Sequence, residues 1–434
     1  MTLSLRARMS RARPLLVAAA LVAGISACEQ TLETGIACPA LCPQLGDSLS
    51  DTTLFPVDFD TSVGVFPITG KEDQVLLMVH AGVYDARAIV RFDSLHATFR
   101  YKGEFIDNDI VALDTAMVKF KIARADTLGP ALTIEAYDVD DTSATAPDDT
   151  AAASLVPRFT AGRLLGSQTF PAATLKDTLV LALDKAKVLE KIVGDTLRRL
   201  RLGLRVVGPG PAEIALTTGN GGAPPFLFLT PTADTAQSDT TAEDVIIPAL
   251  SQTPEDLQTA VELADFQIIA VDPVPPPSDV IRVGGAPGRR AYIRFNIPTQ
   301  ILDSSAVVRA TLIMTQRPNP QAPNANDTAG VAHFELLASP LITDRRRALV
   351  FLGFGGDTIG LAPKDSGPRE FEMITAIRRW RLTSATRTPR VIALVGRQEG
   401  LRAWQVDFYG HLASISVQPR LRLTYIPQPK RGLP

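Results

Sequence analysis

Short runs in which apolar and polar residues alternate occur along most of the chain, and they constrain its fold more than any other feature. The alternation has the side-chain period of a half-buried β-strand, and Gly, Pro, Asn and Asp-Thr separate the runs. The chain is therefore expected to be all-β, with antiparallel sheets. The expected strands lie at 75–79, 88–92, 117–122, 132–137 and 202–207 in one set and at 291–295, 310–314, 333–337, 391–395, 403–409 and 421–425 in another.

Two motifs indicate that the second set repeats the first. The motif Ala-x-x-Arg-Phe ends at Phe92 and again at Phe295, an offset of 203 residues. The motif Pro-x-Leu-x-Leu-Thr ends at Thr230 and again at Thr424, an offset of 194 residues. Self-similarity at such spacings is typical of homologous structural units that follow each other in one chain.

One amphipathic segment precedes each of the second motifs. Residues 183–193 and 374–382 have apolar side chains at intervals of three and four, which predicts a short helix in each place. One short helix among many strands leaves the all-β class unchanged. We therefore expect two tandem β-sandwich domains, at 51–245 and 246–429, each with one short helix.

The composition agrees with ordinary globular domains and excludes several other classes. The 434-residue chain is 45% hydrophobic and 21% charged, which is unlike a disordered or a fibrous protein. Its 44 Lys and Arg residues nearly balance its 46 Asp and Glu residues, for a formal net charge of −2. Because this balance provides no overall basic field to hold a phosphate backbone, no nucleic-acid partner is expected.

Residues 1–27 are expected to be an export signal. An apolar stretch at 15–26 is too short to span a membrane comfortably, and no later segment reaches the roughly 20 apolar residues that a spanning helix needs. Four arginines form a positive region before this stretch, at Arg6, Arg8, Arg11 and Arg13.

The end of this signal carries a specific motif. The sequence Ile25-Ser-Ala-Cys28 resembles the lipobox of bacterial lipoproteins, and the resemblance implies lipidation of Cys28 and cleavage before it. Several acyl chains together make a stable membrane anchor. Glu29 stands where inner-membrane lipoproteins of enteric bacteria carry Asp, which favours the outer membrane of the cell envelope. The alternative is an ordinary secretory signal that is cut after Ala27 and leaves a free cysteine.

Residues 28–50 are expected to form a polar tether between the lipid and the folded part of the chain. Cys38 and Cys42 lie four positions apart in this segment, and in an oxidising compartment they could form a disulfide. A loop this short constrains little chain entropy, so the disulfide would stiffen the tether only. The alternative is a redox or metal site at the same two cysteines.

The sequence contains none of the compact catalytic motifs of zinc proteases, serine hydrolases, nucleotide-binding loops or dinucleotide-binding folds. No spacing marks two carboxylates as a glycosidase pair. We therefore expect a protein without enzymatic activity and without a cofactor. The four histidines are far apart in the sequence, at His80, His96, His333 and His411.

Two acidic segments are expected to be solvated loops, with structural calcium as the alternative. Carboxylate oxygens are the ligands that calcium prefers, although neither segment matches the twelve-residue calcium loop. The first holds Asp107 and Asp109, and the second holds Asp138, Asp140 and Asp141.

The candidate ligand surface lies on the strand expected at 403–409. Period two places Gln405, Asp407 and Tyr409 on one face, and we expect Trp404, Val406 and Phe408 on the core face. The first face could stack on a sugar and hydrogen-bond to it, although an exposed mixed surface without a ligand is the more ordinary interpretation. Arg91 and Arg294 are further candidates for the ligand surface. We interpret them first as cross-strand partners whose aliphatic stems cover apolar surface. Trp380 is expected to fill the core.

The order of these parts resembles the DNRLRE, or disaggregatase-related, family of jelly-roll β-sandwiches. The resemblance covers about 370 residues and rests on short motifs, with the second half matching better than the first. It implies jelly-roll-like sandwiches of the carbohydrate-binding kind. The lipobox, the two-fold repeat and the missing catalytic motifs lead us to expect a non-enzymatic outer-membrane lipoprotein that binds a glycan or another envelope component. The alternatives are a structural or protein-docking lipoprotein and a lipid-anchored hydrolase. The matching segments are Arg91 to Asp93, Arg294 to Pro298, Ala310 to Leu312, Ile377 to Trp380 and Pro419 to Tyr425.

Overall fold

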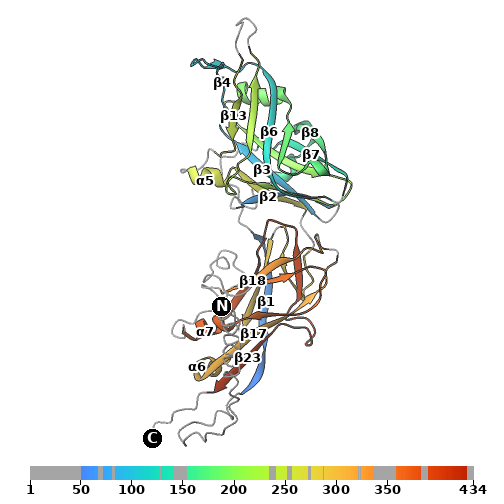
Figure 1. Ribbon diagram of the computed structural model, residues 1–434, viewed down its shortest axis with the longest axis vertical. Coiled ribbons are helices and arrows are strands. Elements are labelled where there is room, and N and C mark those ends of the chain that lie inside the picture. Colours follow the sequence, from blue (N-terminus) through green and yellow to red (C-terminus); the bar gives the residue numbers. More distant parts are fainter. Residues whose placement is uncertain are drawn as a thin grey trace, which may run out of the picture. The chain divides into compact units, whose positions relative to one another are not determined.

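The folded part of the chain is all-β with antiparallel strand pairs, as expected, and has a sandwich-like architecture (Figure 1). The predicted signal segment, Cys28, Cys38 and Cys42 lie outside the described residues. Among the residues that are described, no helix is long and apolar enough to cross a membrane. The computed structural model describes residues 50–66, 72–80, 84–127, 129–140, 154–233, 241–251, 257–271, 275–286, 288–320, 322, 324–335, 358–382 and 390–427.

The first sheet assembly has 11 strands in the order β13-β12-β6-β11-β2-β3-β10-β7-β8, with β14 on β3 and β9 on β6. A separate two-stranded sheet joins β4 (Thr98–Phe99) and β5 (Asn108–Asp109). The strands of the assembly are β2 (Gln74–His80), β3 (Tyr84–Phe92), β6 (Leu113–Thr127), β7 (Ala131–Asp138), β8 (Leu164–Pro171), β9 (Thr178–Ala182), β10 (Leu200–Val207), β11 (Ala212–Thr217), β12 (Phe226–Pro231), β13 (Val245–Pro248) and β14 (Asp265–Val271).

The second sheet assembly has 10 strands in the order β1-β23-β17-β22-β15-β16-β21-β18-β19, with β20 on β17. The strand β1 also pairs with β16, so it borders the assembly on two sides. The strands are β1 (Ser50–Phe66), β15 (Val280–Gly284), β16 (Gly288–Phe295), β17 (Ser305–Arg317), β18 (Ala329–Glu335), β19 (Ile359–Leu361), β20 (Gly367–Glu372), β21 (Val391–Gly396), β22 (Gln405–Tyr409) and β23 (Arg420–Pro427).

Both predicted helices are present. The helix α4 (Lys185–Val193) begins where the Asp184 carboxylate accepts hydrogen bonds from two backbone N–H groups of the first turn, a standard N-cap. The helix α7 (Ile374–Leu382) has the predicted limits, and Trp380 on it is buried against Phe295, with ring centroids 5.9 Å apart. The expectation that Trp380 fills the core is confirmed. Short helical segments also occur at α5 (Leu257–Glu262), α6 (Thr299–Ser304), Val156–Arg158, Ala161–Arg163 and Ala172–Thr174.

Each assembly encloses its own hydrophobic core, and burial follows the strand period where one face meets solvent. Along β9, residues alternate between exposed and buried, whereas every residue of the central strand β11 is buried. The long strand β6 pairs with β12 and β9 over its first part and with β11 over its last part. It therefore takes part in both sheets around the first core.

The strand pairing does not follow the predicted limits of 51–245 and 246–429. The first strand of the folded chain, β1, pairs with β16 and β23, and Figure 1 shows it in blue among the orange and red strands of the second assembly. Conversely, β13 pairs with β12 and β14 pairs with β3. The reason is that alternation identifies a strand from its own residues, whereas the partners of β1 lie more than 200 positions away in the sequence.

Candidate functional site

One pocket among the described residues brings several polar groups together around Glu213, and we call it the Glu213 pocket. Its volume is about 590 Å³, which lies in the range of small-molecule binding sites. It is formed by the end of β2, the start of β3, the end of β6, the start of β11 and the segment 322–327 before β18. Its polar lining residues are His80, Tyr84, Asp126, Glu213, Asn324, Asn326 and Asp327.

Glu213 is a buried carboxylate in an otherwise apolar strand, so its charge requires partners. Burial raises the pKa of this carboxyl, while the Arg124 guanidinium and two hydrogen bonds oppose the rise. The carboxamide of Asn324 donates to Oε2 at 2.9 Å, and the backbone N–H of Ala403 donates to the same oxygen at 3.2 Å. Arg124 donates to Oε1, so both oxygens are engaged. Glu213 is therefore a positioned acceptor with a fixed orientation.

Arg124, on β6, links this carboxylate to its surroundings. Its guanidinium also donates to the Asp126 carboxylate at 2.9 Å and to the Leu401 carbonyl at 2.9 Å. One cation thus lies between two carboxylates of the pocket. The Asp126 side chain is exposed and lines the pocket, so its carboxylate can accept further hydrogen bonds there.

The segment before β18 is held by a second group of contacts. The Arg402 guanidinium lies 3.1 Å from the Asp327 carboxylate, and the Trp404 indole donates to the Asp327 carbonyl at 3.1 Å. Because the indole is buried in the core, it fixes the backbone of Asp327 at the rim of the pocket. These contacts therefore hold this side of the pocket in place.

Sequence reasoning expected Gln405 and Asp407 on an exposed face, but both side chains are buried. The Tyr84 hydroxyl donates to Gln405 Oε1 at 3.2 Å, and burial raises the pKa of that hydroxyl. Asp407 lies directly opposite Arg282 on β15 and accepts two hydrogen bonds from its guanidinium, at 2.7 and 2.9 Å. Alternation separates the two faces of a strand, but it does not show what covers the outer one.

Tyr409, the third residue of the predicted surface, is half-buried. Its ring lies 5.9 Å from the guanidinium of Arg317, a distance at which a cation and an aromatic face attract each other. Of the three residues, only Tyr409 keeps partial contact with solvent. The predicted surface on β22 is therefore largely occupied by protein contacts, and none of its residues lines the Glu213 pocket.

Arg91 and Arg294 take the roles that were expected first, as cross-strand partners. Arg294 donates to the Asp58 carboxylate at 2.8 Å, and its guanidinium lies 5.2 Å from the ring of Phe59. Arg91 is buried, with its guanidinium 5.4 Å from the ring of Phe266. Both arginines thus contact the strand that borders their own, and neither lines the Glu213 pocket.

One pair that the sequence did not reveal joins His411 to Asp60. The imidazole Nδ1 lies 2.8 Å from Asp60 Oδ1, and the backbone N–H of His411 donates to Oδ2 at 2.6 Å. The two residues are 351 positions apart, so only the pairing of β1 with the second assembly brings them together. His80, which the sequence marks only as far from the other histidines, lines the Glu213 pocket.

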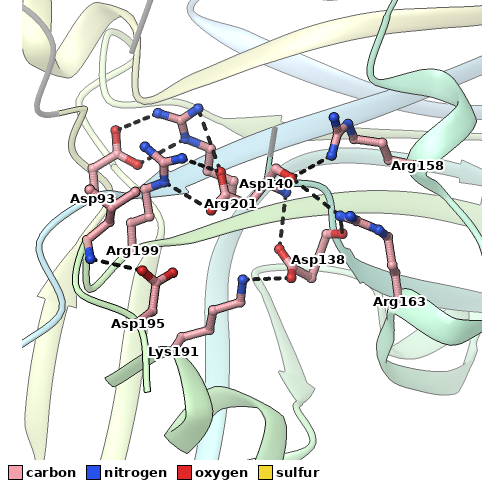
Figure 2. Close-up of polar contacts among 10 residues, drawn as sticks. Asp93, Asp138, Asp140, Arg158, Arg163, Lys191, Asp195, Arg199 and Arg201 are labelled. Atoms are coloured by element: carbon pink, nitrogen blue, oxygen red, sulfur yellow. Dashed lines mark hydrogen bonds and ion pairs between the residues drawn. The ribbon is translucent and has the colours of Figure 1, made fainter. Parts of the chain in front are cut away.

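The acidic segment at Asp138 and Asp140 is bound by cations, so it is not a solvated loop (Figure 2). Lys191 lies 2.9 Å from the Asp138 carboxylate, and Arg199 lies 2.9 Å from the buried Asp140 carboxylate. Arg201 lies 3.2 Å from Asp93 in the same cluster. These cations neutralise the carboxylates that the calcium alternative needs as ligands.

The other residues of the calcium alternative are placed as follows. Asp107 pairs with Arg100 at 2.6 Å, and Asp109 is exposed on β5, while Asp141 lies outside the described residues. Within the part of the chain that the structure describes, no three His, Cys, Asp or Glu side chains are grouped closely enough to hold a metal ion.

Comparison with known proteins adds no family to this description. No protein-family model matches the chain, and no curated protein matches it in sequence.

Proposed function

We propose that the protein is a lipid-anchored protein of the bacterial envelope that binds a glycan, or another polyhydroxylated envelope component, in the Glu213 pocket. The observation that carries this proposal is the convergence of three carboxylates, two carboxamides and one imidazole on a single cavity. Such groups donate to and accept from hydroxyls in both directions, which is the chemistry of sugar recognition. The lipobox-like motif at Cys28 supports the envelope location.

The hydrogen bonds that Glu213 makes fit a binding role better than a role in hydrolysis. A glycosidase needs one carboxyl group that can release a proton and one that can act as base or nucleophile. Both oxygens of Glu213 are already bound to protein donors. Among the described residues, the carboxylates of Asp126 and Asp327 are each bound by an arginine through Oδ2 only, so both keep acceptor capacity for a ligand hydroxyl.

The first test measures glycan retention. The chain from Glu29 onward would be passed over a panel of immobilised polysaccharides, and then compared with the variants His80→Ala and Asn326→Ala. We expect at least about tenfold weaker retention for both variants, because each removes a hydrogen-bonding group from the pocket. Glu104→Gln is the matched control, since Glu104 is exposed and does not line the pocket. Equal retention of all four proteins would contradict the proposal, and turnover of a retained glycan would favour a hydrolase.

The second test concerns the anchor. Cys28→Ser should leave the protein unlipidated and move it from the membrane fraction to the soluble fraction, because the thiol is the site of the first acylation that the lipobox implies. Cys38→Ser is the control, and it should stay in the membrane fraction. If the Cys28→Ser protein also remained there, the lipobox interpretation would be wrong.

A second candidate function is docking to another envelope protein, and one observation favours it. The connection between β4 and β5 carries Phe105 and Ile106, which are 90% and 70% exposed, and Val111 nearby is 76% exposed. Exposed apolar side chains that are grouped can mark a contact site, whereas single ones are common on protein surfaces. Phe105→Ser with Ile106→Ser should abolish co-purification of an envelope protein under this alternative and leave glycan retention unchanged under the first.

A further inference from the structure

The two assemblies are built on equivalent central strands. Phe92 ends β3 and Phe295 ends β16, so these strands correspond at the offset of 203 residues. One edge of β3 carries β14, and the equivalent edge of β16 carries β1. We call the strands at these edges the closing strands, because each also continues to the facing sheet, through β13 on β12 and through the first part of β1 on β23.

The closing strands correspond to each other residue by residue along β3 and β16. Asp265 lies opposite Val90, and Asp60 lies opposite Ile293, which is the same position at the offset of 203 residues. Both aspartates are buried. A buried carboxylate at the same register of both assemblies indicates a common origin for the two strands.

The contacts of these aspartates correspond as well. Asp265 Oδ2 accepts the backbone N–H of Gly219 at 3.0 Å, and Asp60 Oδ2 accepts that of His411 at 2.6 Å. Gly219 and His411 are equivalent, since each lies two positions beyond the end of β11 or β22. An aspartate carboxylate therefore caps the equivalent loop in each assembly.

The correspondence extends to the facing sheets. Leu54 lies opposite Arg422, and Ile246 lies opposite Phe228. Arg422 and Phe228 share one position of the repeated motif that ends at Thr230 and Thr424, so Leu54 and Ile246 are also equivalent. In both strands a proline follows two positions later, at Pro56 and Pro248.

The order along the chain is what makes this correspondence informative. The closing strand β1 directly precedes β2, the first strand of the first assembly, yet it pairs with the second assembly. The closing strands β13 and β14 directly precede β15, the first strand of the second assembly, yet they pair with the first. Each sequence repeat therefore begins with a closing strand that completes the other repeat.

We propose that the two repeats have exchanged their closing strands, so that the chain is an intramolecular strand-exchanged pair. Exchange of an identical element between two equivalent units is a common route to association, and here both units belong to one chain. The exchange interlocks the assemblies, because neither repeat contains all the strands of one complete sandwich. Under this proposal, one structural unit is 72–271 and the other combines 50–66 with 275–427.

Cysteine pairs test the exchange in the full-length chain, with Cys28, Cys38 and Cys42 replaced by serine. Leu54→Cys with Arg422→Cys and Ile246→Cys with Phe228→Cys join the pairs that are observed. Leu54→Cys with Phe228→Cys and Ile246→Cys with Arg422→Cys join the pairs that an unexchanged chain would form. Directly opposite residues of antiparallel strands are about 4.5–5.5 Å apart at Cα, within disulfide reach.

Mass spectrometry after mild oxidation reads the result. We expect most of the chain to carry the disulfide in the two exchanged variants and only background levels in the two unexchanged ones. The reverse pattern, or equal cross-linking in all four, would overturn the proposal. Leu54 and Ile246 are 46% and 49% exposed, so the substitutions leave the cores intact. If far-UV circular dichroism shows a folded chain and neither exchanged pair forms, the proposal is also wrong.

Discussion

Asp60 and Asp265 occupy equivalent places in the two assemblies but have different partners. Both are buried, and both accept a backbone N–H through Oδ2. Asp60 Oδ1 also meets the imidazole of His411 at 2.8 Å, whereas Asp265 Oδ1 has no hydrogen-bond partner among the described residues. Burial accordingly raises the pKa of Asp265 from 3.8 to about 7. The same kind of backbone contact therefore occurs beside an imidazole at Asp60 and without one at Asp265.

The segment inserted between β13 and β14 explains the difference. Gly219 stands where the second assembly has His411, and a Cβ atom at Gly219 would lie 2.7 Å from Val261 Cγ1. Val261 belongs to α5, a helix within this inserted segment. The side chain of Val261 therefore fills the space beside position 219, which leaves no room there for an imidazole.

The largest expected effect is the pH dependence that Asp265 confers. Because the pKa of Asp265 is higher in the folded state, this residue adds to the free energy of unfolding at low pH. The contribution is fully present below about pH 4 and is lost as the pH rises through about 7. The free energy of unfolding should fall by roughly 3 kcal/mol between about pH 5 and pH 8. Urea titrations at both pH values measure this fall, and Asp265→Asn should abolish most of it. An equally steep fall in the variant would assign the titration to another group.

Removal of the Asp60 carboxylate should have the next largest effect on the free energy of unfolding. Asp60→Ala leaves the imidazole and the backbone N–H of His411 without their acceptor, which costs about 2 kcal/mol of unfolding free energy. Chemical denaturation near neutral pH measures the loss. Asp58→Ala is the matched control, because Asp58 is an exposed acid on the same strand, and its loss should be smaller.

A methyl group at position 219 tests the steric account. Gly219→Ala should cost about 1–2 kcal/mol, because the new Cβ atom would overlap Val261 Cγ1. Val261→Ala should restore part of this stability in the double variant, as a thermodynamic cycle of the two substitutions would show. Additive losses would indicate that Val261 does not fill this space.

The smallest effect is expected for Arg294, whose ion pair with Asp58 is largely exposed. Arg294→Ala should cost less than about 1 kcal/mol, as is usual for surface ion pairs. Arg91→Ala at the equivalent buried position should cost more, because its guanidinium and stem lie against Phe266. Equal losses would mean that burial does not distinguish the two arginines.

The sequence predicted elements much better than it predicted partners. Alternation located β3, β16 and β22, and helical spacing located α7 at its observed limits, because these features depend on residues close together in the chain. The burial of Asp407 and the contact between Asp60 and His411 could not be predicted in this way. Both depend on strand pairing across 125 and 351 positions, which leaves no periodic trace.

The Glu213 pocket was missed for the same reason. Its lining residues come mainly from β2, β3, β6, β11 and the segment before β18, and none of them forms a motif with its neighbours. The one local signal is Glu213 itself, a charged residue in the apolar run 212–217. A buried charge in a central strand requires a partner, so Glu213 indicates a possible site.

The place of β1 determines how a mechanical load would pass through the molecule. Under the proposed anchoring, tension on the lipid reaches the folded chain at Ser50, the first residue of β1. Because β1 pairs with both β23 and β16, interstrand hydrogen bonds to two strands would hold the place where the tension enters. The second assembly would therefore be the first part of the fold to receive the tension, although the segment next along the chain after β1 belongs to the first assembly.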